Sequence, residues 1–235
     1  MTFPPRLRIP DFDEWGLTAF TTSRAAGTYG THTAAPAADV LGRWNALVEA
    51  AAQAGAPRFA SATQVHAADI VPHGPGWQGW LRNAAADGHI WFTPGTAAAV
   101  TVADCVPVFL AHPSGAAALL HSGWRGTAAG ITERAIASFN EAGFGPGSLR
   151  MHLGPAICGP CFEVSAEVYA AVTGSSAERA RNLDLRSTIA DRARQSGVRD
   201  IGISEWCTRC SRDQLFSHRA GDDGRQLGVL ITPRR

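Results

Sequence analysis

The stretch from residue 97 to residue 120 constrains the fold more than any other, because it predicts three consecutive short strands: 97–102, 106–111 and 116–120. Pro113-Ser114-Gly115 is a turn sequence between the last two runs, which predicts a β-hairpin. In an antiparallel pair the start of one strand lies beside the end of the other. Cys105, just before the second strand, is therefore expected close to His121, just after the third.

The rest of the chain mixes helical and strand patterns without a steady βαβ alternation. Helical spacing is found at 39–54, 126–143, 165–172 and 183–197. Further strands are expected at 17–24, 149–157, 198–204 and 228–232, with two strand pieces in 59–72 and a loop at 73–80. We therefore predict an α+β fold in which mixed β-sheets pack with helices, in a single domain spanning 1–235.

Composition excludes several classes of function. All 21 basic residues are arginine, so chemistry that needs a lysine (Schiff bases, pyridoxal phosphate, the P-loop) is excluded. No GxGxxG follows a predicted strand, and a net charge of +1 gives no basic surface for nucleic acid. The chain shows neither a leader peptide nor an apolar run long enough to cross a membrane. We expect a cytoplasmic enzyme for small molecules, a monomer or small homo-oligomer.

Three residues of metal-binding types stand at predicted strand ends: His66, Cys105 and His121. Two imidazoles and one thiolate, with a fourth position open, are typical of catalytic zinc. The same Cys–His pair fits a nucleophile and its base, and a buried structural cysteine with two hydrogen-bonded histidines fits the spacing equally. The residues alone leave these three interpretations open.

The other four cysteines form two CxxC pairs, CGPC at 158–161 and CTRC at 207–210. Four thiolates are the ligand set of a structural zinc site. The 45 residues between the pairs exceed the common spacing of about 15–20, however, which favours paired or buried thiols. A thioredoxin-type role is weaker still, because neither pair begins a helix after a strand.

Arginines near predicted turns are candidates for binding an anion. Arg125 lies between a predicted strand and a helix, and Ser217 and Arg219 belong to the polar segment FSHRAGDDGRQLG. A guanidinium in such a place binds phosphate or carboxylate well. A surface salt bridge and a solvated loop would give the same sequence pattern.

Five motifs, in order, resemble those of the YfiH/YlmD/FAMIN family, also called laccase-domain or multicopper polyphenol oxidase-like proteins. They are ATQVHAADI, ADGHIWFTPGTAAAVTVADCVPVFL, LLHSGWRGTAAGI, LGPAICGPCFEV and WCTRCSRDQLFSHRAGDDGRQLGVL, and they run from about residue 60 to the C-terminus. The resemblance implies an α+β fold and a zinc ion held by His66, Cys105 and His121. It also implies phosphorolysis of adenosine, inosine, guanosine and methylthioadenosine, and deamination of adenosine.

The front of the chain departs from the family pattern. Where relatives carry paired glycines and Asn-Leu-Gly, this chain has SRAAGTYGTHTAAPAADV, although Arg24 is kept. His218 stands where relatives carry tyrosine. Of the properties that the resemblance implies, substrate preference is therefore the one that carries over least well from the family to this chain.

Within this resemblance we assign roles by placement beside the motifs. The catalytic candidates are Asp104, Arg125 and Glu163; the substrate and phosphate candidates are Arg24, Gln64, Arg125, Ser217 and Arg219. Asp104 is expected to orient a ligand or a water, and Glu163 to act as acid or base. Two other classes compete: a copper-dependent polyphenol oxidase with copper in the same site, and a thiol hydrolase with Cys105 as nucleophile, which includes editing of peptidoglycan precursors. Multicopper chemistry needs many more histidines than the two in these motifs.

Overall fold

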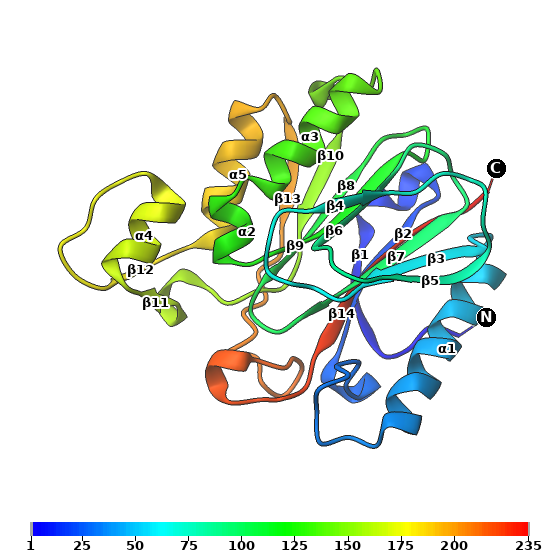
Figure 1. The fold of residues 1–235 in the computed structure, drawn as a ribbon, viewed down its shortest axis with the longest axis horizontal. Helices are drawn as coiled ribbons and strands as arrows, with labels where there is room; N and C mark the ends of the chain where they lie inside the picture. The colour runs from blue at the N-terminus through cyan, green and yellow to red at the C-terminus, as the bar shows by residue number, and fades with distance from the viewer. Residues whose placement is uncertain (1, 235) are drawn as a thin grey trace.

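Two six-stranded β-sheets pack face to face in the computed structural model, which describes residues 2–234 (Figure 1). In order across the first sheet, the strands are β1 (Arg6–Ile9), β2 (Thr18–Thr22), β14 (Gln226–Thr232), β7 (Thr96–Val102), β3 (Arg58–Ala62) and β5 (Gly79–Asn83). In the second they are β13 (Asp200–Ile203), β10 (Arg150–Leu153), β8 (Val106–Ala111), β9 (Ala117–Ser122), β6 (Gly88–Trp91) and β4 (Ile70–Pro72). Both sheets contain parallel and antiparallel pairs, which confirms the predicted α+β class with mixed sheets.

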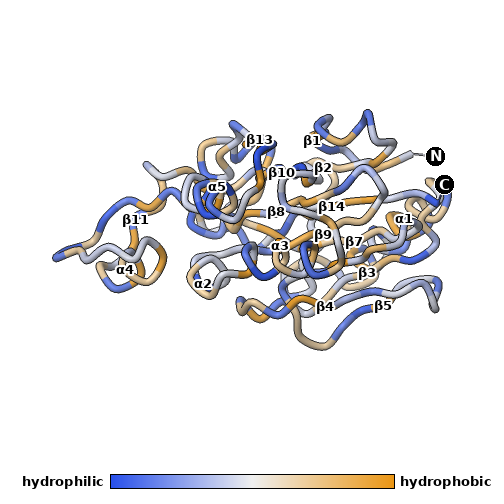
Figure 2. The backbone as a smooth tube through the Cα atoms, turned by 90° about the horizontal axis from the view of Figure 1, so that it is seen from above, coloured by the Kyte–Doolittle hydropathy of each residue, from blue (hydrophilic) through white to orange (hydrophobic). Residues whose placement is uncertain are grey.

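The helices cover the two outer faces of this sandwich. They are α1 (Ala37–Gln53), α2 (Trp124–Ala128), α3 (Ile131–Glu141), α4 (Ala166–Thr173) and α5 (Leu185–Gln195). Helix α1 lies on the first sheet, and α2 and α3 contact β9 of the second (Figure 1). The segment with α4 and the short pair β11 (Glu163–Val164) and β12 (Arg181–Asn182) projects from the sandwich (Figures 1 and 2).

Strand alternation builds a separate core on each side of a sheet, because successive side chains point to opposite faces. Val100 of β7 belongs to the buried cluster between the sheets, together with Phe109 and Leu119. Its neighbour Ala99 belongs to the cluster under α1, together with Leu47. A third cluster joins the outer face of the second sheet to α3 and α5. The layers are therefore helix, sheet, sheet, helix.

Two sequence predictions are wrong in detail. The helix expected at 126–143 is two helices, because Gly130 adopts a left-handed φ of 76° between α2 and α3. The loop expected at 73–80 ends in β5, an edge strand whose exposed residues lack the alternation that marks a half-buried strand. Within residues 2–234, no helix has both the length and the apolarity needed to span a membrane.

Three connections cross from the first sheet to the second at one edge of the sandwich. Strand β3 runs parallel to both β5 and β7, so the C-terminal ends of all three lie at the same edge. From there the chain passes from β3 to β4, from β5 to β6 and from β7 to β8. These connections carry His66, Asp87 and Cys105. Strand β9 lies between β6 and β8 and brings His121 to the same place.

Candidate metal centre and adjoining cavities

His66, Cys105 and His121 converge at the crossing edge. One ligand atom from each lies within 4.8 Å of the other two. The hairpin register pairs Pro107 with His121, so the cysteine before β8 sits beside the histidine near the end of β9, as the hairpin geometry requires. The two imidazole rings approach edge-on, with centroids 4.8 Å apart. Residues far apart in sequence thus form one compact group of two imidazoles and a thiol.

Asp87 holds this group from behind, and sequence reasoning gave it no role. Its carboxylate is fully buried, and Oδ1 accepts a hydrogen bond from His121 Nδ1 at 2.8 Å. The backbone N–H groups of His66 (3.0 Å) and Ala67 (2.7 Å) donate to the same carboxylate. With Nδ1 engaged, Nε2 of His121 is the nitrogen left to face a metal. The only feature of the sequence that could have identified Asp87 is its position as an acidic residue directly before a fully buried strand, β6.

The backbone is strained at two residues of the site. His66 and Asp104 are the two residues in 2–234 other than glycine that have positive φ, at 57° and 84°. Hydrogen bonds from the backbone N–H groups of His66 and Ala67 to Asp87 stabilise the strained conformation at His66. Strain of this kind persists only where surrounding contacts over-determine it, and it clusters at functional sites.

The electrostatics of the group favour a thiolate. Burial raises the pKa of Cys105, but the charge and hydrogen bonds of His121 and His66 bring it down to about 6. Burial lowers the pKa of His121, whereas the Cys105 thiolate and the Asp87 carboxylate raise it to about 9. Thiolate is the form of cysteine that binds metal.

Gly123 leaves room for the Cys105 sulfur. A Cβ atom at this position would lie 2.8 Å from Cys105 Sγ and 3.6 Å from His66 Nδ1. The backbone of Gly123 has φ −82°, which any residue adopts. Glycine is therefore required here by the close approach of the ligands and not by its conformation.

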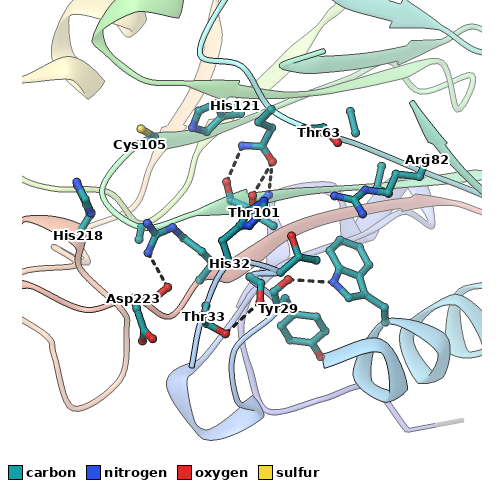
Figure 3. Close-up of a pocket in the computed structure, with 18 of the residues that line it drawn as sticks. Tyr29, His32, Thr33, Thr63, Arg82, Thr101, Cys105, His121, His218 and Asp223 are labelled. Atoms are coloured by element: carbon teal, nitrogen blue, oxygen red, sulfur yellow. Dashed lines mark hydrogen bonds between the residues drawn. The ribbon is translucent and has the colours of Figure 1, made fainter. Parts of the chain in front are cut away.

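A first cavity of about 380 Å³ begins at the group and extends toward α1 (Figure 3). Figure 3 shows Cys105 and His121 at one end of it, His218 and Asp223 on one side and Arg82 on the other. Trp44 and Trp80 also line it, stacked with ring centroids 5.3 Å apart.

Gln64 belongs to the wall of this first cavity. Its amide is bound at both ends by Thr101, whose N–H donates to Oε1 at 2.7 Å and whose carbonyl accepts from Nε2 at 2.8 Å. Gln64, proposed from the sequence to bind substrate, thus fastens the loop before His66 to β7.

A second cavity of about 310 Å³ lies on another side of the group, and His66 and Cys105 line both. Arg125 and Arg219 contribute its positive charge. The guanidinium of Arg125 lies 4.3 Å from the centroid of the Trp124 ring, and among residues 2–234 it forms no ion pair or hydrogen bond. Two cavities, each lined by both aromatic and arginine side chains, therefore adjoin one candidate metal-binding group.

Asp104 lies beside the group but faces the C-terminal loop. Its carboxylate accepts hydrogen bonds from Thr208 Oγ1 at 2.5 Å and from the backbone N–H of Arg219 at 2.6 Å. These hydrogen bonds hold the 208–219 loop beside Cys105, and the expected role of Asp104 in orienting a ligand or a water stays a prediction.

Three further candidates line neither cavity. Arg24 is bound by Asp222 at 2.6 Å and by the carbonyl of Leu215 at 3.0 Å, so it braces the loop from outside. Ser217 is buried, and its hydroxyl accepts from Ala220 N–H. Glu163 is exposed in β11, where its carbonyl accepts from Arg219. Their contacts with substrate, suggested by the sequence, stay predictions.

The CxxC pairs form a second sulfur-rich cluster. The four Sγ atoms of Cys158, Cys161, Cys207 and Cys210 lie within 4.8 Å of one another. The long sequence separation favoured paired or buried thiols over a four-thiolate zinc site; the four sulfur atoms meet because an isolated β-bridge between Ala156 and Cys207 joins the two segments.

Comparison with known proteins gives consistent similarities. The family model described as "Multi-copper polyphenol oxidoreductase laccase" matches residues 23–233. A purine nucleoside phosphorylase of Streptomyces coelicolor is 36% identical over 175 residues, which cover 71% of this chain and 72% of that protein. One of Deinococcus radiodurans is 31% identical over 200 residues, covering 81% and 76%.

Solved structures show the same fold. The crystal structure of YlmD from Geobacillus stearothermophilus superposes with a TM-score of 0.87 at 26% identity, over 99% of this chain and 98% of that one. The Bacillus licheniformis hypothetical protein YfiH gives 0.86 at 24% identity, over 97% of each chain.

Proposed function

The chain belongs to the multi-copper polyphenol oxidoreductase laccase family, among relatives named purine nucleoside phosphorylases, and we propose that it is itself a zinc-dependent purine nucleoside phosphorylase. Its substrates are adenosine, inosine, guanosine and methylthioadenosine, and it also deaminates adenosine. The observation that carries the proposal is that two cavities, one lined by Trp44 and Trp80 and the other by Arg125 and Arg219, adjoin the group of His66, Cys105 and His121.

The donor set fits zinc. Two imidazoles and one thiolate are three of the four ligands of a catalytic zinc site, with one position left open. Asp87 accepts a hydrogen bond from the far nitrogen of His121, as carboxylates do behind zinc-binding histidines. When bound, zinc supplies a Lewis acid at the junction of the two cavities.

The first cavity suits a purine nucleoside. Its volume of about 380 Å³ lies within the range of small-molecule sites, roughly 300–1,000 Å³. Trp80 offers an aromatic surface for a base, and its indole N–H is fixed by Ser61 at 2.8 Å. Arg82 and His218 add polar groups along the wall. Aromatic surface orients the purine, and the polar groups select among its edges and the ribose hydroxyls.

The second cavity suits phosphate. In phosphorolysis a phosphate oxygen bonds to C1′ while the C1′–N9 bond breaks and its electron pair leaves with the base, which takes up a proton. Attack from the face opposite the base places phosphate and base on two sides of the sugar. Arg125 and Arg219 line the second cavity, which Trp80 does not line. Their charge stabilises the phosphate and holds it for attack.

A nucleoside panel with and without phosphate tests the proposal. We expect adenosine to yield adenine only with phosphate, and to yield inosine with or without it. Arg125→Gln should raise the KM for phosphate and spare deamination, whereas Arg134→Gln, at an exposed position of α3, should change neither. Phosphate-independent release of free base, or no turnover of any nucleoside by zinc-loaded protein, would contradict the proposal.

Assays on the same protein preparation distinguish the alternative activities. A copper-dependent oxidase would oxidise phenols only after copper is added, whereas the zinc-loaded protein should not. A thiol hydrolase would keep its activity when chelator removes the metal, because Cys105 and His121 would then act as nucleophile and base. The His66 ring, whose centroid lies 4.8 Å from that of His121, has no function in a nucleophile–base pair. In a zinc site it supplies the third protein ligand.

A further inference from the structure

Two short cysteine turns, distant in sequence, meet on the surface beside the site. The first contains Cys158 and Cys161 and includes the 3-10 turn Gly159–Cys161; the second contains Cys207 and Cys210. Backbone hydrogen bonds between residues 156, 206 and 208 fix the segments side by side. The backbone N–H of Cys158 donates to Cys207 Sγ at 3.3 Å. The meeting of the turns is therefore imposed by the backbone on both sides.

The arrangement of the sulfur atoms is that of a four-thiolate metal site. With zinc–sulfur bonds of about 2.3 Å, a tetrahedral site separates its sulfur atoms by about 3.8 Å. The four Sγ atoms lie within 4.8 Å of one another, and those of Cys161 and Cys210 are 3.5 Å apart. Two disulfides would need sulfur atoms about 2.05 Å apart in two separate pairs. Here all four converge on one centre.

We propose that Cys158, Cys161, Cys207 and Cys210 bind a second zinc ion, closed by four thiolates and structural in function. Four protein ligands complete the tetrahedron and leave no position for a substrate. This site lies beyond the nucleoside activity, because it shares no residue with the group of His66, Cys105 and His121.

The second site fastens the loop that closes the active site. Thr208, between Cys207 and Cys210, is fully buried and donates its hydroxyl to Asp104. Asp104 precedes Cys105 and also accepts the backbone N–H of Arg219. A zinc ion on the turn thus fixes Thr208, Asp104 and the 208–219 loop together. Its loss should let this loop move while the catalytic ligands remain.

Metal counting on protein purified under reducing conditions tests the proposal. We expect two equivalents of zinc in the wild type and one in Cys161→Ser/Cys210→Ser. Cys105→Ser is the matched control, because the fifth cysteine belongs to the other group: it should lose the other equivalent and keep this one. Replacement by cobalt should give the intense sulfur-to-cobalt absorption of a four-thiolate site in Cys105→Ser and not in the double variant.

If the double variant fails to fold, the wild type and Cys105→Ser decide between the outcomes. A single equivalent of zinc that disappears in Cys105→Ser would overturn the proposal. A disulfide among the four cysteines, found by mapping peptides alkylated without reductant, would overturn it as well. A failed nucleoside assay with two zinc equivalents present would instead contradict only the proposed function.

Discussion

Replacing Asp87 by asparagine should weaken metal binding and destabilise the fold, although the side chain hardly changes in size. Oδ1 accepts from His121 and from His66 N–H, and Oδ2 accepts from the N–H groups of Val65 and Ala67. An asparagine keeps only one acceptor oxygen. Whichever way it turns, its NH2 group faces donors.

Each orientation has a definite cost. With the nitrogen at the Oδ2 position, two backbone donors lose their acceptor, at about 1–3 kcal/mol each, so the free energy of unfolding falls by about 2–6 kcal/mol. With the nitrogen at the Oδ1 position, His121 Nδ1 must accept the hydrogen bond. The imidazole proton then sits on Nε2, the nitrogen that faces the metal. Loss of such a supporting carboxylate costs about 10–100-fold in metal affinity, or about 1.4–2.7 kcal/mol.

The assay pairs a chelator competition for zinc with urea unfolding of the metal-free protein. Asp69→Asn is the matched control, because this exposed aspartate lies next to β4 and lines neither cavity. The control should behave as wild type in both measurements. If Asp87→Asn binds zinc as tightly as the control and unfolds at the same urea concentration, the role given to this carboxylate is refuted.

Three further changes should have separable effects. Gly123→Ala should lower zinc affinity roughly tenfold in the same competition, since its Cβ would crowd the ligand thiol, and leave the urea midpoint of metal-free protein near wild type. Thr208→Val should cost about 1–3 kcal/mol in urea unfolding by removing a donor to Asp104, and Thr208→Ser should restore it. Burial lowers the pKa of His73 to about 4 and of His89 to about 3, whereas in the unfolded chain both have a pKa of 6.5. Below pH 6.5 the unfolded chain therefore binds protons that the folded chain does not bind. Stability should therefore be complete above pH 6.5 and fall by about 1.4 kcal/mol per pH unit per histidine toward pH 4, and a flat urea midpoint between pH 7 and 5 would contradict this.

Local patterns predicted the elements whose residues alternate or repeat strongly. The hairpin of β8 and β9 was predictable because two buried runs flank a turn sequence. Strand β6 was not, because four residues buried on both faces carry no periodicity. The edge strand β5 was not predicted for the opposite reason: its residues are mostly exposed and show no buried face. Short and edge strands acquire their structure from neighbours.

Only those parts of the site that residue types alone suggest could be predicted from the sequence. Two histidines and a cysteine suggest metal wherever they stand, and the family motifs joined them. Asp87 is a different case, because an aspartate becomes a support only when buried N–H groups surround it. Those donors come from the loop before β4, which no local pattern places near β6. Arg24 shows another contact that the sequence does not reveal, because its guanidinium is paired with Asp222.

The sheet topology explains why separations of 39 and 16 residues between the ligands present no obstacle. Because β3, β5 and β7 are parallel, each must leave the first sheet at the same edge, and each connection delivers one group there. Two of the groups are candidate ligands, and the third, on the crossing from β5 to β6, is the carboxylate of Asp87. A fourth ligand on that crossing would have closed the site. A buried carboxylate there instead orients His121 from behind and leaves the group open toward both cavities, as a catalytic centre requires.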